Sequence, residues 1–411
     1  MSWRMAILVS LAIAISYLDR QTLPVAIQSI GRDIPLTNSQ FSALQSAFLF
    51  SYALMYAGGG KLVDYLGTRR GFVVIMLFWS IASASHALAT SFLLLATSRF
   101  LLGMGEGGGF PAATRAVAEF FSPQDRATAM GIINAGTAVG GVMAPPLIAL
   151  VLLDANWRWI FVLTAALGVL WTLAWIRFGQ HPPPPSLNEE GSGSSSQPPP
   201  PWIRLLVVRE TWGLVTAKFL SDAAWFFYLF WLPKYLYEAR GFDVQAVGTY
   251  AWMPSAAAGV GCIVGGVFSS HLVRRGFSLG AARKTALGLS AALMPFVILI
   301  PHIPVYWAIF IFCLAYFGQQ SWSTLVMVLP ADLFPQTVVG SVAGLVGFGG
   351  ALGGIAFGQM AGYLLDHGFG YSTVFTLAGM FHVAAFLLIL GFVPSVEPLA
   401  FHEILGCEAA P

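Results

Sequence analysis

Twelve long apolar segments divide this sequence, and their length restricts the class of fold that the chain can form. A helix needs about 20 apolar residues to cross the roughly 30 Å hydrocarbon core of a bilayer. Segments of that order lie at about residues 5–30, 38–60, 71–89, 91–119, 127–152, 157–178, 209–237, 244–270, 283–301, 304–330, 338–365 and 370–393. Membrane-spanning strands would instead alternate apolar and polar residues over about 10 positions. The sequence therefore predicts an all-α polytopic membrane protein with twelve transmembrane helices.

Charged residues are too scarce for a protein of this size that is surrounded by water. They make up 9% of the 411 residues, whereas 57% are hydrophobic and the mean hydropathy is +0.75. Soluble domains carry about 25% charged residues. The net charge of +2 provides no basic surface for nucleic acid, and the three cysteines match no metal or disulfide spacing. We therefore expect no soluble enzyme, no metal or other cofactor and no nucleic-acid partner.

A proline-rich stretch near the middle of the sequence separates six apolar segments from six others. Residues 181–201 read HPPPPSLNEEGSGSSSQPPPP, a composition typical of a hydrated linker. We predict an N-terminal six-helix bundle at 1–178, a cytoplasmic linker at 179–203, a C-terminal six-helix bundle at 204–395 and a cytoplasmic tail at 396–411. With both termini inside, 13 of the 20 Lys and Arg residues are cytoplasmic, four lie outside and three lie within the membrane. The positive-inside rule favours this orientation.

The two halves of the sequence carry matching glycines, which indicates an internal repeat. A shift of 213 residues places Gly131, Gly136, Gly140 and Gly141 on Gly344, Gly349, Gly353 and Gly354. The stretch AEFF at 118–121 falls on ADLF at 331–334 under the same shift. Parallel repeats of this kind place the binding site of a transporter near the bilayer midplane, between the halves. We therefore expect two pseudo-symmetric bundles.

Ionisable residues within the apolar segments are few, and they are the first candidates for function. Burying one at a helix centre costs at least about 2.5–3.5 kcal/mol, so such residues are paired or functional. The first segment holds the adjacent pair Asp19 and Arg20, whose side chains point about 100° apart on a helix. A planar guanidinium such as that of Arg20 suits a bidentate carboxylate partner, although a structural ion pair with another helix is an alternative.

The fourth and seventh segments each carry an acidic and a basic residue in their central parts. Arg99 and Glu106 share a helix face but lie about 10 Å apart along the axis, too far for direct contact on a straight helix. A buried glutamate is suited to carrying a proton, and the alternative for Glu106 is a structural hydrogen bond. Lys218 and Asp222 have the i,i+4 spacing of a same-face ion pair. We expect that pair to be structural, with a gating or coupling role as the alternative.

Uncharged polar and aromatic side chains within the segments form a second group of candidates. They would suit a polyhydroxylated ligand, although each could equally hydrogen-bond between helices. This group contains Gln45, Tyr52, Asn134, Trp225, Gln319, Gln320, Trp322 and Thr324.

The loop after the second segment carries a recognisable motif. Residues 60–71 read GKLVDYLGTRRG, in which Gly67 allows a tight turn and the charged residues can cap and pair helices. The motif resembles the G-x-L-x-D-R-x-G-x-R-R loop of the major facilitator superfamily, except that Tyr65 replaces a basic residue. The resemblance implies a conformational latch formed by Gly60, Asp64, Gly67, Arg69 and Arg70.

Four further stretches resemble the anion:cation symporter branch of that superfamily, which includes bacterial hexuronate, galactonate and glucarate carriers. They are YLDR at 17–20, RFLLGMGEGGGFPAA at 99–113, KFLSDAAWFFYLFWLPKYL at 218–236 and VGSVAGLVG at 339–347. The resemblance implies that Arg20 binds a substrate carboxylate beside Tyr17 and Tyr52, and that Asp19 and Glu106 take up protons, with Arg99 controlling Glu106. An asparagine frequent in the family's helix eleven is absent from GFG at 347–349.

We therefore predict proton-coupled symport of an organic anion, a sugar acid such as a hexuronate or aldonate, by alternating access. The protein is expected to lie in the bacterial inner membrane as a multi-pass monomer, with both termini cytoplasmic and with lipid, proton and a small organic anion as its partners. Three alternatives stay open: sodium as the coupling ion, proton-driven efflux of a metabolite or drug, and a membrane sensor that binds without transporting.

Overall fold

The computed structural model describes residues 2–121, 126–179, 202–334, 336–397 and 399, which are helical almost throughout. For residues 2, 57–61, 64, 118, 126–128, 202, 203, 331, 336, 337, 339 and 340 it describes the backbone alone. Most of the predicted linker and tail, 180–201 and 400–411, lies outside the described residues. The helices are α1 (Ser2–Asp33), α2 (Asn38–Ser85), η1 (His86–Leu88), α3 (Phe92–Gly107), α4 (Gly109–Phe120), α5 (Arg126–Asp154), α6 (Arg158–Phe178), α7 (Trp202–Leu205), α8 (Arg209–Arg240), α9 (Val244–Tyr250), α10 (Met253–Arg274), α11 (Leu279–Ala292), η2 (Met294–His302), α12 (Val305–Leu333), α13 (Gln336–Asp366) and α14 (Gly370–Phe392).

Counted across the bilayer, these described helices make twelve passes, which confirms the predicted number. Helix α2 contains the second and third passes, because Gly67 interrupts it with φ +74°, a conformation that favours glycine. The fourth, eighth and ninth passes are each divided into two pieces. The breaks lie at Gly108, before Pro254 and before Pro295, and proline lacks the N–H that would continue a helix.

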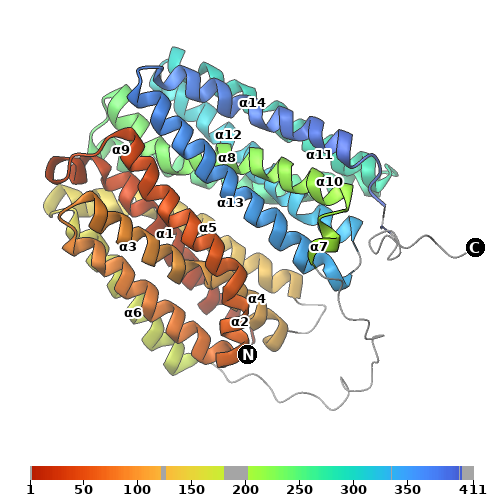
Figure 1. Ribbon diagram of the computed structural model, residues 1–411, viewed down its shortest axis with the longest axis horizontal. Helices are drawn as coiled ribbons and strands as arrows, with labels where there is room; N and C mark the ends of the chain where they lie inside the picture. Colours follow the sequence, from red (N-terminus) through yellow and green to blue (C-terminus); the bar gives the residue numbers. More distant parts are fainter. Residues whose placement is uncertain (1, 122–125, 180–201, 335, 398, 400–411) are drawn as a thin grey trace, which may run out of the picture.

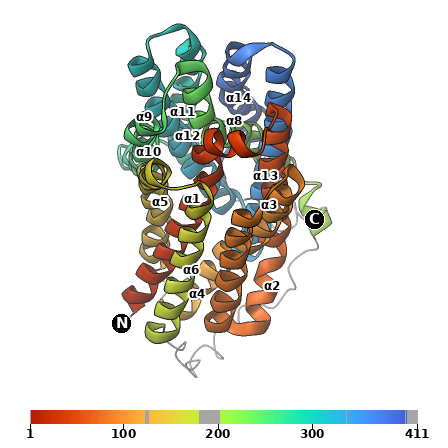
Figure 2. The same cartoon turned by 90° about the vertical axis from the view of Figure 1, so that its left-hand side faces the viewer.

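The helices form two groups of six passes, with α1–α6 in one half and α8–α14 in the other (Figure 1). Figure 2 shows the same division from the end where α9 lies. The repeat is visible in the packing of the glycines. A Cβ on Gly140 would lie 2.2 Å from the carbonyl oxygen of Ala14, and one on Gly353 would lie 1.9 Å from that of Phe219. Helix α5 thus packs on α1 as α13 packs on α8.

Nine stretches among the described residues are long and apolar enough to cross a membrane. The other three passes are the first part of α2, the α3–α4 pair and α8. These three carry six of the polar candidates: Gln45, Tyr52, Arg99, Glu106, Lys218 and Asp222. Large apolar side chains such as Ile81, Leu170 and Ile263 face outward, as a lipid environment requires. The passes with the weakest apolar character are therefore the ones to examine for function.

Hydrogen bonds join the two halves at the end opposite to the N-terminus of α1, which we call the closed end. The Asp366 carboxylate on α13 accepts the backbone N–H groups of Asn38, at 2.9 Å, and of Ser39, at 2.8 Å. Gln359 Nε2 donates to Ser46 Oγ at 2.8 Å, and the Tyr237 hydroxyl donates to the carbonyl oxygen of Val25 at 2.8 Å.

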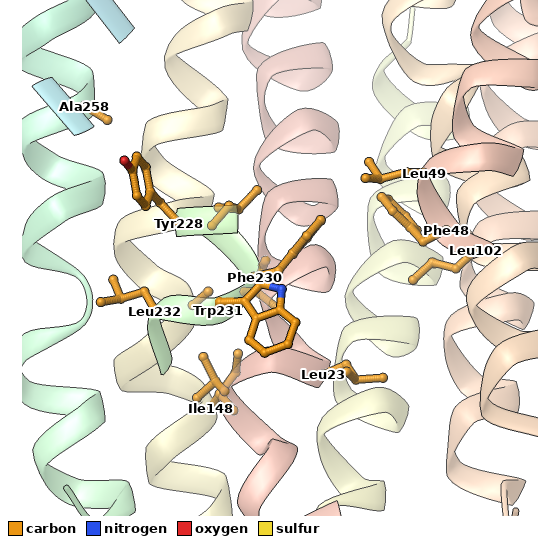
Figure 3. Close-up of a cluster of buried hydrophobic side chains, with 14 of the residues drawn as sticks. Leu23, Phe48, Leu49, Leu102, Ile148, Tyr228, Phe230, Trp231, Leu232 and Ala258 are labelled. Atoms are coloured by element: carbon orange, nitrogen blue, oxygen red, sulfur yellow. The ribbon is translucent and has the colours of Figure 1, made fainter. Parts of the chain in front are cut away.

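An apolar cluster supports this closure from within the protein. The ring centroids of Phe41 on α2 and Trp231 on α8 lie 5.0 Å apart, edge to face. Figure 3 shows the Trp231 indole between Ile148 of α5 and Leu23 of α1, so that one side chain of the C-terminal half packs among three helices of the N-terminal half. Burial of such aromatic side chains provides the main attraction between the halves at this level.

Candidate functional site

The buried guanidinium of Arg20 is the centre of the candidate site. Its Nε donates to Glu106 Oε2 at 2.8 Å, across the contact between α1 and α3. The same carboxylate oxygen accepts a hydrogen bond from Ser16 Oγ at 2.7 Å, whereas Oε1 has no partner among the described residues. The Arg20 and Glu106 residues are 4% and 2% exposed. The structure therefore forms the interhelix ion pair that the sequence left as an alternative for Arg20.

Aromatic rings enclose the rest of the Arg20 side chain. Its Cζ lies 4.6 Å from the ring centroids of both Tyr17 and Tyr52, and 5.6 Å from that of Phe48. Cations over tyrosine and phenylalanine rings are stabilised by the ring quadrupole, more so where water is excluded. Tyr17 and Tyr52 are half-buried. The structure thus places both tyrosines beside Arg20, where the sequence resemblance puts the substrate.

Asp19 faces away from Arg20, as the angle between neighbouring helical residues predicts. Its Oδ2 accepts the indole N–H of Trp79 at 2.5 Å, and its Oδ1 accepts a hydrogen bond from Ser83 at 3.1 Å. Ser83 is hydrogen-bonded in turn to Thr164 at 2.9 Å. Trp79 and Ser83 could not be identified from the sequence, because their positions on α2 carry no motif and become relevant only when α2 packs beside α1.

Arg99 is fully buried, and none of its guanidinium nitrogens has a hydrogen-bond partner among the described residues. It interacts electrostatically with Glu106 and Asp19, and its Cζ lies 5.8 Å from the Phe48 ring centroid. The Phe48 ring therefore contacts both buried guanidinium groups. Arg99 and Glu106 make no direct bond, as their seven-residue separation predicts. Two cations and two carboxylates thus share the interior of the N-terminal half.

The C-terminal half holds the second buried ion pair. Lys218 Nζ lies 3.0 Å from Asp222 Oδ1, which confirms the same-face pairing that their spacing predicts. Lys218 also donates to Ser323 Oγ on α12 at 2.9 Å. Behind this pair, Gln319 interacts with Asp222 and its Oε1 is hydrogen-bonded to His382 Nε2 on α14. The sequence analysis gave His382 no role, because its fully buried position depends on the packing of α14.

Two of the candidates in α12 pack between helices. Trp322 is fully buried in an apolar cluster of the C-terminal half, beside His382 at 5.5 Å between ring centroids, and its substrate contact stays a prediction. Thr324 hydrogen-bonds to the carbonyl oxygen of Gln320 at 2.9 Å and contacts Cys262 of α10, so it packs between helices. The polar run at 319–324 turns by about 100° per residue, which distributes its side chains to different neighbours.

The remaining polar candidates differ in accessibility. Trp225 and Gln320 are half-buried, and the Trp225 ring packs edge to face on Tyr316 with 5.1 Å between centroids. Gln45 is buried with neither amide atom hydrogen-bonded among the described residues, whereas Asn134 is exposed. Gln45 is thus a polar group that has unused hydrogen-bonding capacity inside the membrane region.

The loop motif is only partly visible. The side chain of Asp64 lies outside the described residues, and for Gly60 the backbone alone is described, within α2. Gly67 makes the predicted turn. Arg69 donates to the carbonyl oxygen of Ile176 on α6 at 2.9 Å, within its own half, and Arg70 is exposed. The predicted latch between the halves stays a prediction.

Comparisons with known proteins agree with this architecture. Residues 9–358 match the family model of the Major Facilitator Superfamily. The chain is 30% identical to the hexuronate transporter of Escherichia coli (strain K12), covering 94% of this chain and 93% of that protein. It is 31% identical to the galacturonate transporter of Dickeya chrysanthemi, over 71% and 88% of the two chains. A solved bacterial homolog of the human lysosomal transporter Spinster, in an inward-facing and unoccupied conformation, has the same fold, with a TM-score of 0.72 at 18% identity over 96% of both chains.

Proposed function

This chain belongs to the major facilitator superfamily of membrane transporters and is not an enzyme; from that premise we propose that it imports a sugar acid together with a proton. The substrate class is a hexuronate or an aldonate, and the mechanism is alternating access of one site to the two sides of the membrane. The observation that carries the proposal is the Arg20 guanidinium, which is buried between two tyrosines and bonded to a single carboxylate.

The Arg20–Glu106 pair provides a way to couple the anion to a proton. A buried unpaired charge costs several kcal/mol, so Arg20 is stable only beside one carboxylate. In the structure that carboxylate is Glu106. A substrate carboxylate can replace it at Arg20 only if Glu106 becomes neutral, which requires a proton. Anion and proton therefore enter the site together and leave it together.

Asp19 and Arg99 add a second acid and a second cation to the Arg20–Glu106 pair. Arg99 interacts with both Asp19 and Glu106, so protonation of one acid changes the field at the other through this shared cation. Asp19 keeps its own donors, Trp79 and Ser83, and is available as a second proton acceptor. Arg99 thus acts as the fixed positive charge that keeps both acids within reach of ionisation in a buried site.

The relatives support the substrate class, because they are a hexuronate transporter and a galacturonate transporter. We further propose that the protein lies in the inner membrane as a functional monomer with both termini in the cytoplasm. In that orientation the closed end faces the outside of the cell.

Uptake into proteoliposomes tests the coupling. Radiolabelled D-glucuronate should accumulate when the outside is made acidic, and Glu106→Gln should abolish this accumulation while retaining exchange of internal for external substrate. The matched control is Glu119→Gln on α4, since Glu119 pairs with Arg115 at the bundle end and is not part of the site. Arg20→Ala should bind the substrate much more weakly.

Several outcomes would contradict the proposal. Normal uptake by Arg20→Ala would remove the carboxylate assignment, and pH-driven accumulation by Glu106→Gln would remove the coupling role. If a sodium gradient drives accumulation at equal pH on both sides, the coupling ion is sodium and not the proton. Binding without uptake would indicate a sensor. Accumulation inside the vesicles that occurs only when protons flow out of them would indicate proton-driven efflux.

A further inference from the structure

The buried pair Lys218 and Asp222 has no role in the coupling scheme above, although it lies inside the membrane region. The two residues are on one stripe of α8 at i and i+4, and Trp225 continues that stripe three residues later. Their side chains are 8% and 11% exposed, so the pair is buried but not sealed. Trp225 is half-buried. A charged hydrogen-bonding pair beside an aromatic ring is a chemistry suited to a polyhydroxylated ring.

The pair lies near the anion site of the other half. Asp222 interacts electrostatically with Tyr17, and Tyr17 lies against the Arg20 guanidinium. The tyrosine beside Arg20 is therefore within electrostatic range of Asp222. This arrangement crosses from α1 of the N-terminal half to α8 of the C-terminal half.

The surrounding helices leave hydrogen-bonding capacity on the pair. Lys218 has three N–H groups and uses two, for Asp222 and Ser323. The Asp222 Oδ2 atom faces Gly350 of α13, where a Cβ would lie only 2.2 Å from it. Because position 350 is glycine, α13 packs directly against this carboxylate oxygen without displacing it.

We propose that Lys218 and Asp222, with the Trp225 ring, form a hydroxyl-binding subsite in the C-terminal half. A substrate hydroxyl donates to Asp222 and a neighbouring hydroxyl accepts from Lys218, while Arg20 holds the carboxylate at the other end. This subsite rests on the proposed function, because it requires a polyhydroxylated anion at Arg20. The bonds from Gln319 and Ser323 hold the pair in place for this contact.

A comparison of two ligands on purified protein tests the subsite. D-galacturonate carries a carboxylate and ring hydroxyls, and tetrahydropyran-2-carboxylate has the same ring and carboxylate without hydroxyls. Isothermal titration gives a Kd for each, and their ratio measures the preference for hydroxyl groups. One hydrogen bond to a charged group changes Kd about 10- to 100-fold. Lys218→Met and Asp222→Asn should each reduce the preference by at least about tenfold.

The ratio separates recognition from folding. It does not depend on the fraction of protein that is folded, and the double variant Lys218→Met/Asp222→Asn removes the unpaired charge that each single variant leaves. The control is Lys234→Met, which breaks an i,i+4 pair with Glu238 on the same helix and should leave the ratio unchanged. Arg20→Ala should weaken both ligands alike.

Three results would overturn the subsite. If the Lys218 and Asp222 variants weaken both anions by the same factor, the pair is structural or part of a gate. If the wild-type protein binds tetrahydropyran-2-carboxylate as tightly as D-galacturonate, hydroxyl groups are not recognised, although the carboxylate site stands. Binding of neither anion by the wild type would instead contradict the proposed function itself and, with it, the subsite.

Discussion

Replacing Asp366 with alanine should open the closed end more often. The Asp366 carboxylate accepts the first two backbone N–H groups of α2, those of Asn38 and Ser39. The third donor, from Gln40, is satisfied within the same half by the Thr37 side chain, which forms a capping box. Because Thr37 remains in place, the substitution leaves α2 capped. The free energy lost in Asp366→Ala therefore comes from the contact between the two halves.

The size of the effect follows from the two bonds. Removing a side chain that caps a helix costs about 0.5–2 kcal/mol, typically about 1 kcal/mol. Asp366 is exposed, so water competes for the same N–H groups and the lower part of this range applies. About 1 kcal/mol changes an equilibrium about fivefold. The fraction of molecules with the closed end open should therefore rise about fivefold in Asp366→Ala.

Labelling of a buried cysteine measures that fraction. Ser42 is fully buried beneath Gly362 at the closed end, and Ser42→Cys is a small change once the three native cysteines are serine. A membrane-impermeant maleimide can reach this cysteine only while the end is open, so its labelling rate should rise about fivefold with Asp366→Ala. Asp33→Ala is the control, since Asp33 bonds to Arg158 within its own half at 2.6 Å. An unchanged rate in Asp366→Ala would show that these bonds do not hold the halves together.

Two further substitutions test the packing. Gly353→Ala should lower the thermal unfolding temperature strongly, because its Cβ would lie 1.9 Å from the Phe219 carbonyl oxygen. The control is Gly344→Ala, whose Cβ meets nothing within 4 Å and which should be neutral. Equal effects of the two substitutions would contradict the close approach of α13 and α8. Arg283→Met should destabilise the protein by about 3 kcal/mol, because it leaves Asp332, now 2.8 Å away, as a largely buried unpaired acid. Adding Asp332→Asn should restore part of that loss in a thermal unfolding assay, and no restoration would refute the pairing.

Features that depend on one helix alone could be predicted from the sequence. The apolar lengths predict the twelve passes, because each helix must satisfy its own backbone inside a bilayer. The spacing of Lys218 and Asp222 predicts their pairing, since i and i+4 share a face on any straight helix. The glycine matches predict the repeat, because a close contact between helices requires glycine in both halves.

Features that depend on the rotation of one helix against another could not be predicted in the same way. Whether Arg20 faces Glu106, Asp19 or a ligand depends on how α1 and α3 pack. The rotation of α1 relative to α3 cannot be calculated from residue spacings within either helix. Trp322 illustrates the same problem in α12, where the run of polar residues does not reveal which side chain faces the core. Ser16 could have been found, because it lies four residues before Arg20 and so shares its face.

The placement of the charges explains why a ligand must contact both halves. Arg20, Glu106, Asp19 and Arg99 all belong to the N-terminal half, so exchanging Glu106 for a substrate carboxylate changes the bonding within that half alone. A ligand shifts a conformational equilibrium only through a difference in its affinity for the two states. An anion bound to Arg20 alone would move with one half and would have nearly the same contacts in both states. In the mechanism proposed above, the substrate therefore acts on the movement of the two halves through contacts with the C-terminal half, such as those with α8.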